Sequence, residues 1–361
     1  MRDLNPMTVA LHGLRVALRS ANNALIKKRP FMKSIIFILS RRSVLLSAAL
    51  ALLGVIGVAS AQSPADKYPE KSIKIVVPFP PGGSTDTLGR AIAQKMQEKW
   101  GQPVVVENRP GASTLIGSTA VAKAAPDGYT LIVSVSSHTT NPAMHSSMPF
   151  DTLKDFQPIS MLARAPVLVV ANPNFPANNI KELIELGRAG KIKLDYGSAG
   201  VGTMTHLTAE LIKKQTGLDL THILYKGGNP AMMDVMSGHL ALTFATLGQV
   251  QPQIKSGRLK ALGISSDTRY ASVSDIPTLK EQGLDVVTIE WFGLLAPAAT
   301  PPSIIAKLNA EVKQIMANPE LGDRLASIEL VSSSAEFLEK FIQAEVNRWE
   351  PVIKELNIKT N

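Results

Sequence analysis

The sequence predicts an α/β fold. From Tyr68 onward, short runs rich in β-branched residues alternate with amphipathic stretches of helical spacing. The joints between these runs are rich in glycine and proline, which is typical of α/β proteins. No period of about 20–50 residues repeats, so nothing indicates a solenoid or a propeller.

The first series of elements spans residues 72–135. Strands are expected at 72–77, 104–107 and 129–135, where valine, isoleucine and leucine dominate. A helix is expected at 86–100, because apolar residues recur there at helical spacing between polar ones.

A second series follows with the same alternation of strands and helices. Strands are expected at 167–171, 194–196, 221–225, 240–244 and 259–264, and helices at 179–188, 203–216, 230–236 and 248–255. The chain then runs through 286–295 and closes with amphipathic helices near 302–316 and 335–356.

Composition bounds the class of protein. The 361 residues are 45% hydrophobic, which is too much for a disordered chain. At about 150 residues per domain, this length predicts two domains. The absence of cysteine excludes disulfide scaffolds, thiol nucleophiles, zinc fingers and iron–sulfur clusters.

The net charge of +9 is concentrated at the N-terminus. Residues 1–61 contain nine basic residues and one acid, giving +8, so that the remaining 300 residues carry only +1. A nearly neutral body lacks the electrostatic footprint of a protein that binds polyanions. We therefore expect no nucleic-acid partner.

A targeting segment explains the basic excess. Arg41 and Arg42 precede an uncharged apolar run at 44–58, which ends in Ala59-Ser60-Ala61 before Gln62. A basic flank, about 15 apolar residues and a small-x-small site define a secretory signal peptide. An uncleaved anchor is the alternative, but a membrane span takes about 20 apolar residues.

We expect cleavage after Ala61 and a soluble, periplasmic product. Met32 begins a conventional signal peptide by itself, so we interpret residues 32–61 as the signal peptide and 1–31 as an over-extended N-terminus. The choice between general and twin-arginine export stays open. Charged residues interrupt every later apolar stretch, so no later segment resembles a membrane span.

Two glycine-rich joints, each between a strand and a helix, are the best candidates for a site. The first is 78–86 (PFPPGGSTD) and the second is 196–203 (YGSAGVGT). Glycine lets the backbone turn sharply and approach a ligand closely, while the free N–H groups of the following helix attract anions. Two such joints facing each other would hold a small carboxylate or phosphate, although each alone also reads as an ordinary turn.

Other chemistries lack their motifs. Neither joint matches the dinucleotide or P-loop fingerprint, no nucleophile elbow occurs, and no H-E-x-x-H is present. We therefore expect no cofactor, no metal and no catalytic residues. The histidines are scattered, and only His206 stands out, one turn into the helix behind the second joint.

Several blocks of sequence resemble one family. They are 76–86 (VVPFPPGGSTD), 106–112 (VENRPGA), 126–130 (PDGYT), 196–203, 225–231 (YKGGNPA), 277–283 (PTLKEQG) and 291–297 (WFGLLAP). In this order they are similar to the extracytoplasmic solute receptors of tripartite tricarboxylate transporters, the Bug-type periplasmic binding proteins. The resemblance covers residues 68–358.

This resemblance implies a two-lobed Venus-flytrap fold of the type II kind, with a mixed sheet and flanking helices in each lobe. The lobes would close on a small organic anion, usually a carboxylate, without a chemical step. The implied boundaries are 68–168 plus 290–361 for lobe I and 169–289 for lobe II, joined by crossing strands.

The resemblance also implies the ligand-binding residues. In the family, the first joint meets the ligand's proximal carboxylate largely through backbone groups and ordered waters. The residues placed at the site in this way are Phe79 as a cleft wall, Pro80, Gly82, Thr85 and Asp86 from the first joint, Ser136, Ser137 and Asn141 from a third loop, and Ser198, Gly200, Thr203 and His206 from the second joint.

One departure from the family concerns the ligand. After 242–244, many relatives carry Asp-Asn, whereas this chain has Ala245 and Thr246, and Thr246 is the candidate contact there. An acid at that position could serve an amino group, so its absence favours a ligand without an amine, unless Asp86 or a water substitutes.

Three hypotheses follow. The first is a monomeric periplasmic receptor that delivers a small organic acid to membrane transporter subunits. The second is the same receptor acting as a sensor for a membrane signalling protein. The third is an exported hydrolase, for which the sequence shows no nucleophile–base pair.

Overall fold

A mixed β-sheet of ten strands runs through the described part of the chain. The computed structural model describes residues 63–190, 192–325 and 327–360, and residues 63–361 form one compact unit. The predicted signal peptide and the segment before it lie outside the described residues. In that described part, no helix is both long and apolar enough to cross a membrane.

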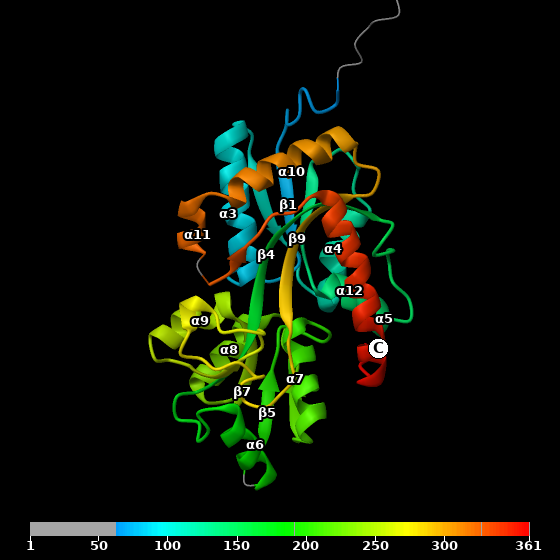
Figure 1. Ribbon diagram of the computed structural model, residues 1–361. Helices are drawn as coiled ribbons and strands as arrows, with labels where there is room; N and C mark the ends of the chain where they lie inside the picture. The colour runs from blue at the N-terminus through cyan, green and yellow to red at the C-terminus, as the bar shows by residue number, and fades with distance from the viewer. Residues whose placement is uncertain (1–62, 191, 326, 361) are drawn as a thin grey trace, which may run out of the picture. The chain divides into compact units, whose positions relative to one another are not determined.

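The elements fall into two groups, which we call the first half and the second half (Figure 1). The first half holds β1 (Ile73–Val77), α3 (Ser84–Trp100), β2 (Val104–Asn108), η1 (Ala112–Thr114), α4 (Leu115–Ala122), β3 (Thr130–Val135), α5 (Ser137–Met144), α10 (Pro302–Met316), α11 (Pro319–Arg324), β10 (Glu329–Leu330) and α12 (Ala335–Glu355). The second half holds α6 (Ile180–Arg188), β5 (Leu194–Gly197), α7 (Met204–Thr216), β6 (Leu220–Ile223), α8 (Gly228–Ser237), β7 (Leu242–Thr246), α9 (Leu247–Lys255), β8 (Lys260–Ile264) and η2 (Ala271–Val273).

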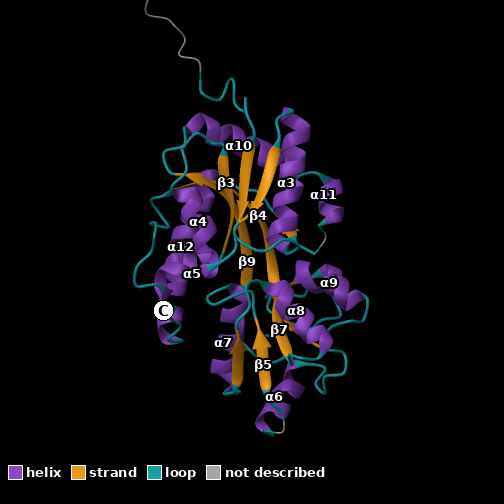
Figure 2. Cartoon of the chain, turned by 180° about the vertical axis from the view of Figure 1, so that it is seen from behind, coloured by secondary structure: helices purple, strands orange, loops and turns teal. Residues whose placement is uncertain are grey.

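Two long strands join the halves: β4 (Phe156–Ala171) and β9 (Ile289–Pro297). The strand order is β2-β1-β3-β9-β4-β7-β5-β6, with β8 and β10 also pairing with β4. β1 pairs in parallel with β2 and β3, and β5 pairs in parallel with β6 and β7. β4 and β9 are antiparallel to each other and run side by side through the middle of both views (Figures 1 and 2).

Both faces of the sheet are buried, which explains the nearly continuous apolar runs in its strands. Alternate residues of β4 enter different cores: Val167 and Val169 pack on one face, and Leu168 and Val170 on the other. Helices cover both faces in each half (Figure 2). This is the predicted α/β fold with mixed sheets and flanking helices, and the predicted two series of elements are confirmed.

The sequence-based expectation was wrong about the length of one strand and missed three α-helices of the described part. The strand expected at 167–171 is the end of the 16-residue β4, whose Pro158, Arg164 and Pro166 obscure the pattern. Antiparallel pairing with β9 carries the strand through these residues, with register shifts at two points. The helices α4, α5 and α11 were not expected. α5 (SHTTNPAM) is made mostly of weak helix formers, and α11 has only six residues.

The C-terminal helix contacts both halves. Leu338 and Ile342 of α12 pack in the core of the first half, whereas Trp349 and Ile353 pack with the core around β5 and α7. After the helix, the Thr360 hydroxyl lies 2.9 Å from Nδ1 of His145. This helix therefore bridges the two halves on the face that carries α5 (Figure 1).

Candidate functional site

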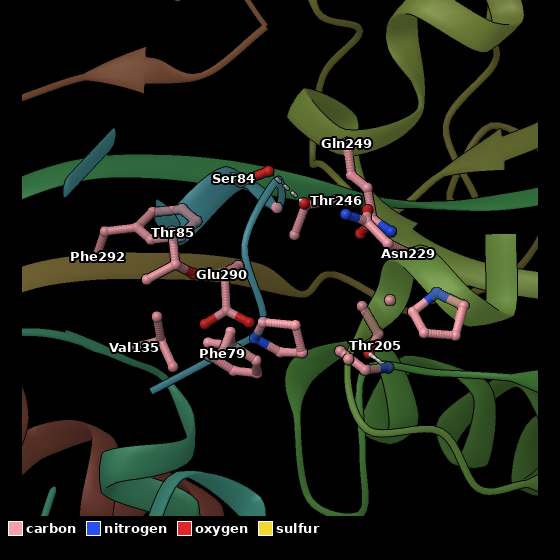
Figure 3. Close-up of a pocket in the computed structure, with 16 residues that line it drawn as sticks. Phe79, Ser84, Thr85, Val135, Thr205, Asn229, Thr246, Gln249, Glu290 and Phe292 are labelled. Carbon is pink, nitrogen blue, oxygen red and sulfur yellow. Dashed lines mark hydrogen bonds between the residues drawn. The ribbon is translucent and has the colours of Figure 1, made fainter. Parts of the chain in front are cut away.

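A pocket lies where the two glycine-rich joints meet, and the structure brings both predicted joints together there (Figure 3). Its space measures about 540 Å³ including the open mouth. The first half contributes Phe79, Pro80, Gly83, Ser84, Thr85 and Val135. The joining strand β9 contributes Glu290 and Phe292. The second half contributes Ala199, Thr205, Gly227, Gly228, Asn229, Pro230, Thr246 and Gln249.

Four helices present their N-terminal ends to this pocket: α3, α7, α8 and α9. Three of them lack a side-chain cap: the N-cap residues of α3 and α8 are Gly83 and Gly227, and the Thr246 hydroxyl makes no hydrogen bond to the first turn of α9. Their first-turn N–H groups are therefore free of side-chain partners. Helix N-termini favour anions, each by about 0.3–1 kcal/mol when exposed and up to about 2 kcal/mol when partly buried.

Hydrogen bonds connect the halves around the pocket. The hydroxyls of Ser84 and Thr246 lie 2.9 Å apart. On α5, Thr140 donates its hydroxyl to the Gly202 carbonyl at 2.8 Å. Ser113 of η1 donates to the Val201 carbonyl, also at 2.8 Å. The structure therefore holds the two halves in contact on either side of the first joint.

Glu290, at the start of β9, is the acid in the pocket and was not predicted from sequence. Only 6% of its surface is exposed. The Ser136 N–H donates to its carboxylate at 2.8 Å. Burial raises the pKa of Glu290 to about 7, and the nearby Glu345 adds to the rise, although the bonds from Ser136 oppose it.

Four predicted residues line this pocket directly: Phe79, Pro80, Thr85 and Thr246. Phe79 and Pro80 also border an adjoining cavity, where Gly200 and Val201 form part of the opposite wall. Gly82 lies in a neighbouring groove beside Asn229 and Met233.

Asp86 lies behind the first joint rather than in the pocket lining. Its carboxylate accepts hydrogen bonds from the Gly82 N–H, the Arg90 guanidinium and the Asn108 amide, each at 2.9 Å. Burial alone would raise the pKa of Asp86, but these bonds outweigh it and hold the pKa below its usual value. Asp86 therefore fixes the shape of the first joint.

The third predicted loop is buried beneath the lining. Ser136 holds Glu290 through its backbone, and its hydroxyl accepts the Trp291 N–H at 3.2 Å. The Asn141 amide donates to the Ser113 carbonyl at 2.8 Å. The Ser137 hydroxyl is buried and has no hydrogen-bond partner within the described residues. Ser136 and Asn141 are therefore placed to position the lining.

The second predicted joint is fixed by side chains from α7 and β6. Thr203 caps α7, and its hydroxyl donates to the Gly200 carbonyl at 2.7 Å. Nδ1 of His206 accepts the Gly202 N–H at 3.1 Å, so that nitrogen carries no proton. Burial lowers the pKa of His206 to about 4, which keeps the ring neutral.

Ser198 and His222 form a close pair. The serine Oγ lies 2.8 Å from the histidine Nε2, a contact that the sequence did not suggest. Ser198 is fully buried, however, and neither residue lines the pocket. Burial lowers the pKa of His222 to about 4, and the neighbouring His206 adds to this. The pair therefore braces the glycine joint and does not present an accessible nucleophile.

Sequence reasoning missed Glu290, Thr205, Asn229 and Gln249. For Glu290 a signal existed: it is the one charged residue in the apolar run 286–297 after Asp285. Asn229 lies inside the block 225–231 that supported the resemblance, at the start of α8. Thr205 and Gln249 carried no local signal. Within the described ranges, no cluster of three or more His, Cys, Asp or Glu side chains is placed to hold a metal ion.

A two-half α/β fold with a small pocket between glycine joints and helix N-termini defines the class of periplasmic binding proteins. The model of the tripartite tricarboxylate transporter family receptor matches residues 88–358, so this chain belongs to that family. The chain is similar to Protein BugT of Bordetella pertussis (strain Tohama I), with 35% identity over 319 residues, covering 86% of this chain and 98% of that protein.

Solved structures agree with this family. The periplasmic binding protein BugD is 32% identical, with a TM-score of 0.77, over 81% of this chain and 100% of that one. The R. palustris protein Rpa4515, solved with adipate, is 33% identical, with a TM-score of 0.78, over 81% of this chain and 99% of that one. The resemblance and the two-lobed fold predicted from sequence are therefore confirmed.

Proposed function

We propose that this protein captures a small organic anion, a carboxylate, between its two halves and delivers it to a tripartite tricarboxylate-type membrane transporter. The observation that carries this proposal is the pocket into which the N-termini of α3, α7, α8 and α9 converge from both halves. The adipate in Rpa4515, a dicarboxylate bound by a relative, supports the same class of ligand.

The proposal includes the organisation of the chain. Lobe I comprises 68–168 plus 290–361, and lobe II comprises 169–289, so that β4 and β9 are the crossing strands. Residues 32–61 act as a signal peptide that is removed after Ala61, and the receptor works in the periplasm as a monomer. N-terminal sequencing of the exported protein, with Gln62 as the expected first residue, tests the cleavage site.

The bound ligand leaves chemically unchanged. No catalytic step is proposed, because the Ser198–His222 pair is buried away from the pocket. The four lining residues predicted from sequence, Phe79, Pro80, Thr85 and Thr246, are proposed as ligand contacts. Asp86, Ser136, Asn141, Ser198, Thr203 and His206 are proposed to act through the loops that they hold, with Gly82 and Gly200 giving those loops their backbone shape. Ser137 is proposed only as part of the buried loop beneath the lining.

The test is calorimetric titration of the chain from Gln62 with mono-, di- and tricarboxylates, amino acids and amides. Thermal unfolding gives a second readout. A cognate ligand at 100 times its Kd stabilises a receptor by about 2.7 kcal/mol, which raises the unfolding temperature by several degrees. Recovery of the intact ligand supports capture without turnover. If no organic acid binds and denatured protein releases none, the proposed function is wrong.

A further inference from the structure

The pocket combines an anion-attracting end with a buried acid. The lining includes four helix N-termini, which favour a carboxylate, yet among the described lining residues the one charged side chain is Glu290. In Figure 3 the Glu290 carboxyl lies with Phe79, Thr85 and Phe292, while Asn229 and Gln249 lie on the opposite side. A ligand in this pocket therefore meets two chemically different environments.

Among the described residues that line the pocket, no cation neutralises Glu290. Lys, Arg and His are absent from the described lining residues contributed by α3, β3, α7, α8 and α9. From α12, the charge of Glu345 acts on Glu290, and this acid is itself paired with Arg348 at 3.1 Å. From the turn into α5, only the N–H and hydroxyl of Ser136 reach Glu290.

We propose that Glu290 is a specificity-determining residue that receives the ammonium group of the ligand, so that the receptor selects amino-carboxylate zwitterions over dicarboxylates. The inference rests on the proposed function and narrows its ligand class. The ligand's carboxylate lies at the helix N-termini and its ammonium lies at Glu290. Although Ala245 and Thr246 remove one possible acid, Glu290 supplies another.

Electrostatics favour this choice. A second carboxylate placed beside ionised Glu290 would repel it in a site where burial weakens screening. An ammonium in the same place supplies the cation that the buried carboxylate lacks among the lining residues, through charge-assisted hydrogen bonds. The rings of Phe79 and Phe292, which line the same pocket, also suit a cationic group.

The pH dependence of binding gives the sharpest test, because the two ligand classes predict opposite signs. An ammonium ligand needs ionised Glu290, whose pKa lies at about 7 in the empty pocket. The competent fraction then rises about tenfold between about pH 6 and pH 8, and the apparent affinity rises with it. A dicarboxylate would instead require protonated Glu290 as a donor, so its affinity would rise as the pH falls.

The experiment titrates the chain from Gln62 with three matched series of increasing chain length. The series are ω-amino carboxylates, ω-dicarboxylates and unsubstituted monocarboxylates, measured by calorimetry at about pH 6 and pH 8. We expect an ω-amino carboxylate to bind best and to gain about tenfold in affinity at the higher pH. In Glu290→Gln, the preference over the matched monocarboxylate should fall at least tenfold and the pH dependence should vanish.

Glu311→Gln is the matched control. Glu311 is another buried acid whose pKa is raised by burial, but it lies on α10 outside the pocket. The Glu311→Gln variant should leave unchanged both the preference for ω-amino carboxylates and the pH dependence of binding. If Glu290→Gln fails to fold, the sign of the pH dependence in the unmodified protein decides alone.

Two results overturn the inference while leaving the proposed function intact. One is a dicarboxylate that binds best and tightens as the pH falls. The other is a Glu290→Gln variant that binds all three series as the unmodified protein does. Failure of every organic acid to bind would instead overturn the proposed function, and this inference with it.

Discussion

Gly202 offers a test of whether the second glycine joint must lie close to α5. Its φ is +71°, and a Cβ added there would lie 1.9 Å from Cε of Met144. Met144 ends α5 in the first half, but its side chain packs in the core around α7. To restore an ordinary contact, the joint and α5 must separate by about 1.5 Å or Met144 must leave its place. Gly202→Ala therefore acts on the contact between the halves.

Gly217→Ala is the control that distinguishes the effect of the Met144 contact from the effect of backbone strain. Its φ is +70°, nearly that of Gly202, and nothing lies within 4 Å of an added Cβ. Gly217→Ala should lower the free energy of unfolding by about 1 kcal/mol through the left-handed backbone alone. Gly202→Ala bears the same cost plus about 1–3 kcal/mol for overpacking.

The assay compares the two variants by urea unfolding without ligand and by calorimetric titration with whichever organic acid binds the unmodified protein. Because the overpacking displaces the second joint, whose Ala199 lines the pocket, Gly202→Ala should weaken ligand binding by roughly 5- to 150-fold. Gly217→Ala should leave the Kd unchanged. Equal Kd values for both variants would refute the claim that the Gly202–Met144 contact shapes the pocket.

Three further predictions concern stability, each measured by urea unfolding. Ala112 has a left-handed φ of +46°, so Ala112→Gly should raise the free energy of unfolding by about 0.5–1 kcal/mol. As the control, Ala120→Gly within α4 should lower the free energy of unfolding by about 1 kcal/mol. Because the pKa of Asp86 is lowered on folding, the unmodified protein should lose stability below about pH 4 as this carboxylate is protonated, and Asp86→Asn should show a smaller loss. The opposite sign holds for Glu290, whose pKa rises from 4.5 to about 7 on folding. The free energy of unfolding of Glu290→Gln relative to the unmodified protein should therefore increase by roughly 2.5 kcal/mol between about pH 5 and pH 8, and a constant difference would contradict the burial argument.

The predictable part of the fold was the part that local patterns determine. The helix at 302–316 appears with the predicted bounds, and β1 differs from its prediction by one residue. β4 was predicted for only its last five residues, because prolines and an arginine interrupt its first eleven. Pairing with β9 and β10 forms that part of the strand, and no local pattern encodes such pairing.

The candidate site divides in a similar way. The two glycine joints were visible because a strand, a glycine run and a helix follow one another in the sequence. Glu290 lies about 200 residues from the first joint, and only the passage of β9 beside β3 and β4 brings it into the pocket. The roles of Asp86 and His206 also depended on the fold, because the loop atoms that they bind are backbone groups.

In the proposed receptor, the distribution of helix N-termini would couple ligand binding to closure of the two halves. One of the four, that of α3, belongs to the first half, and the other three belong to the second half. Each contributes at most about 2 kcal/mol, whereas a micromolar Kd needs about 8 kcal/mol. Neither half reaches that sum alone, so the proposed ligand would be held firmly only when both halves touch it, and it would thereby shift the population toward a closed form. A membrane partner that recognises the closed arrangement of the two halves would then detect the ligand without touching it.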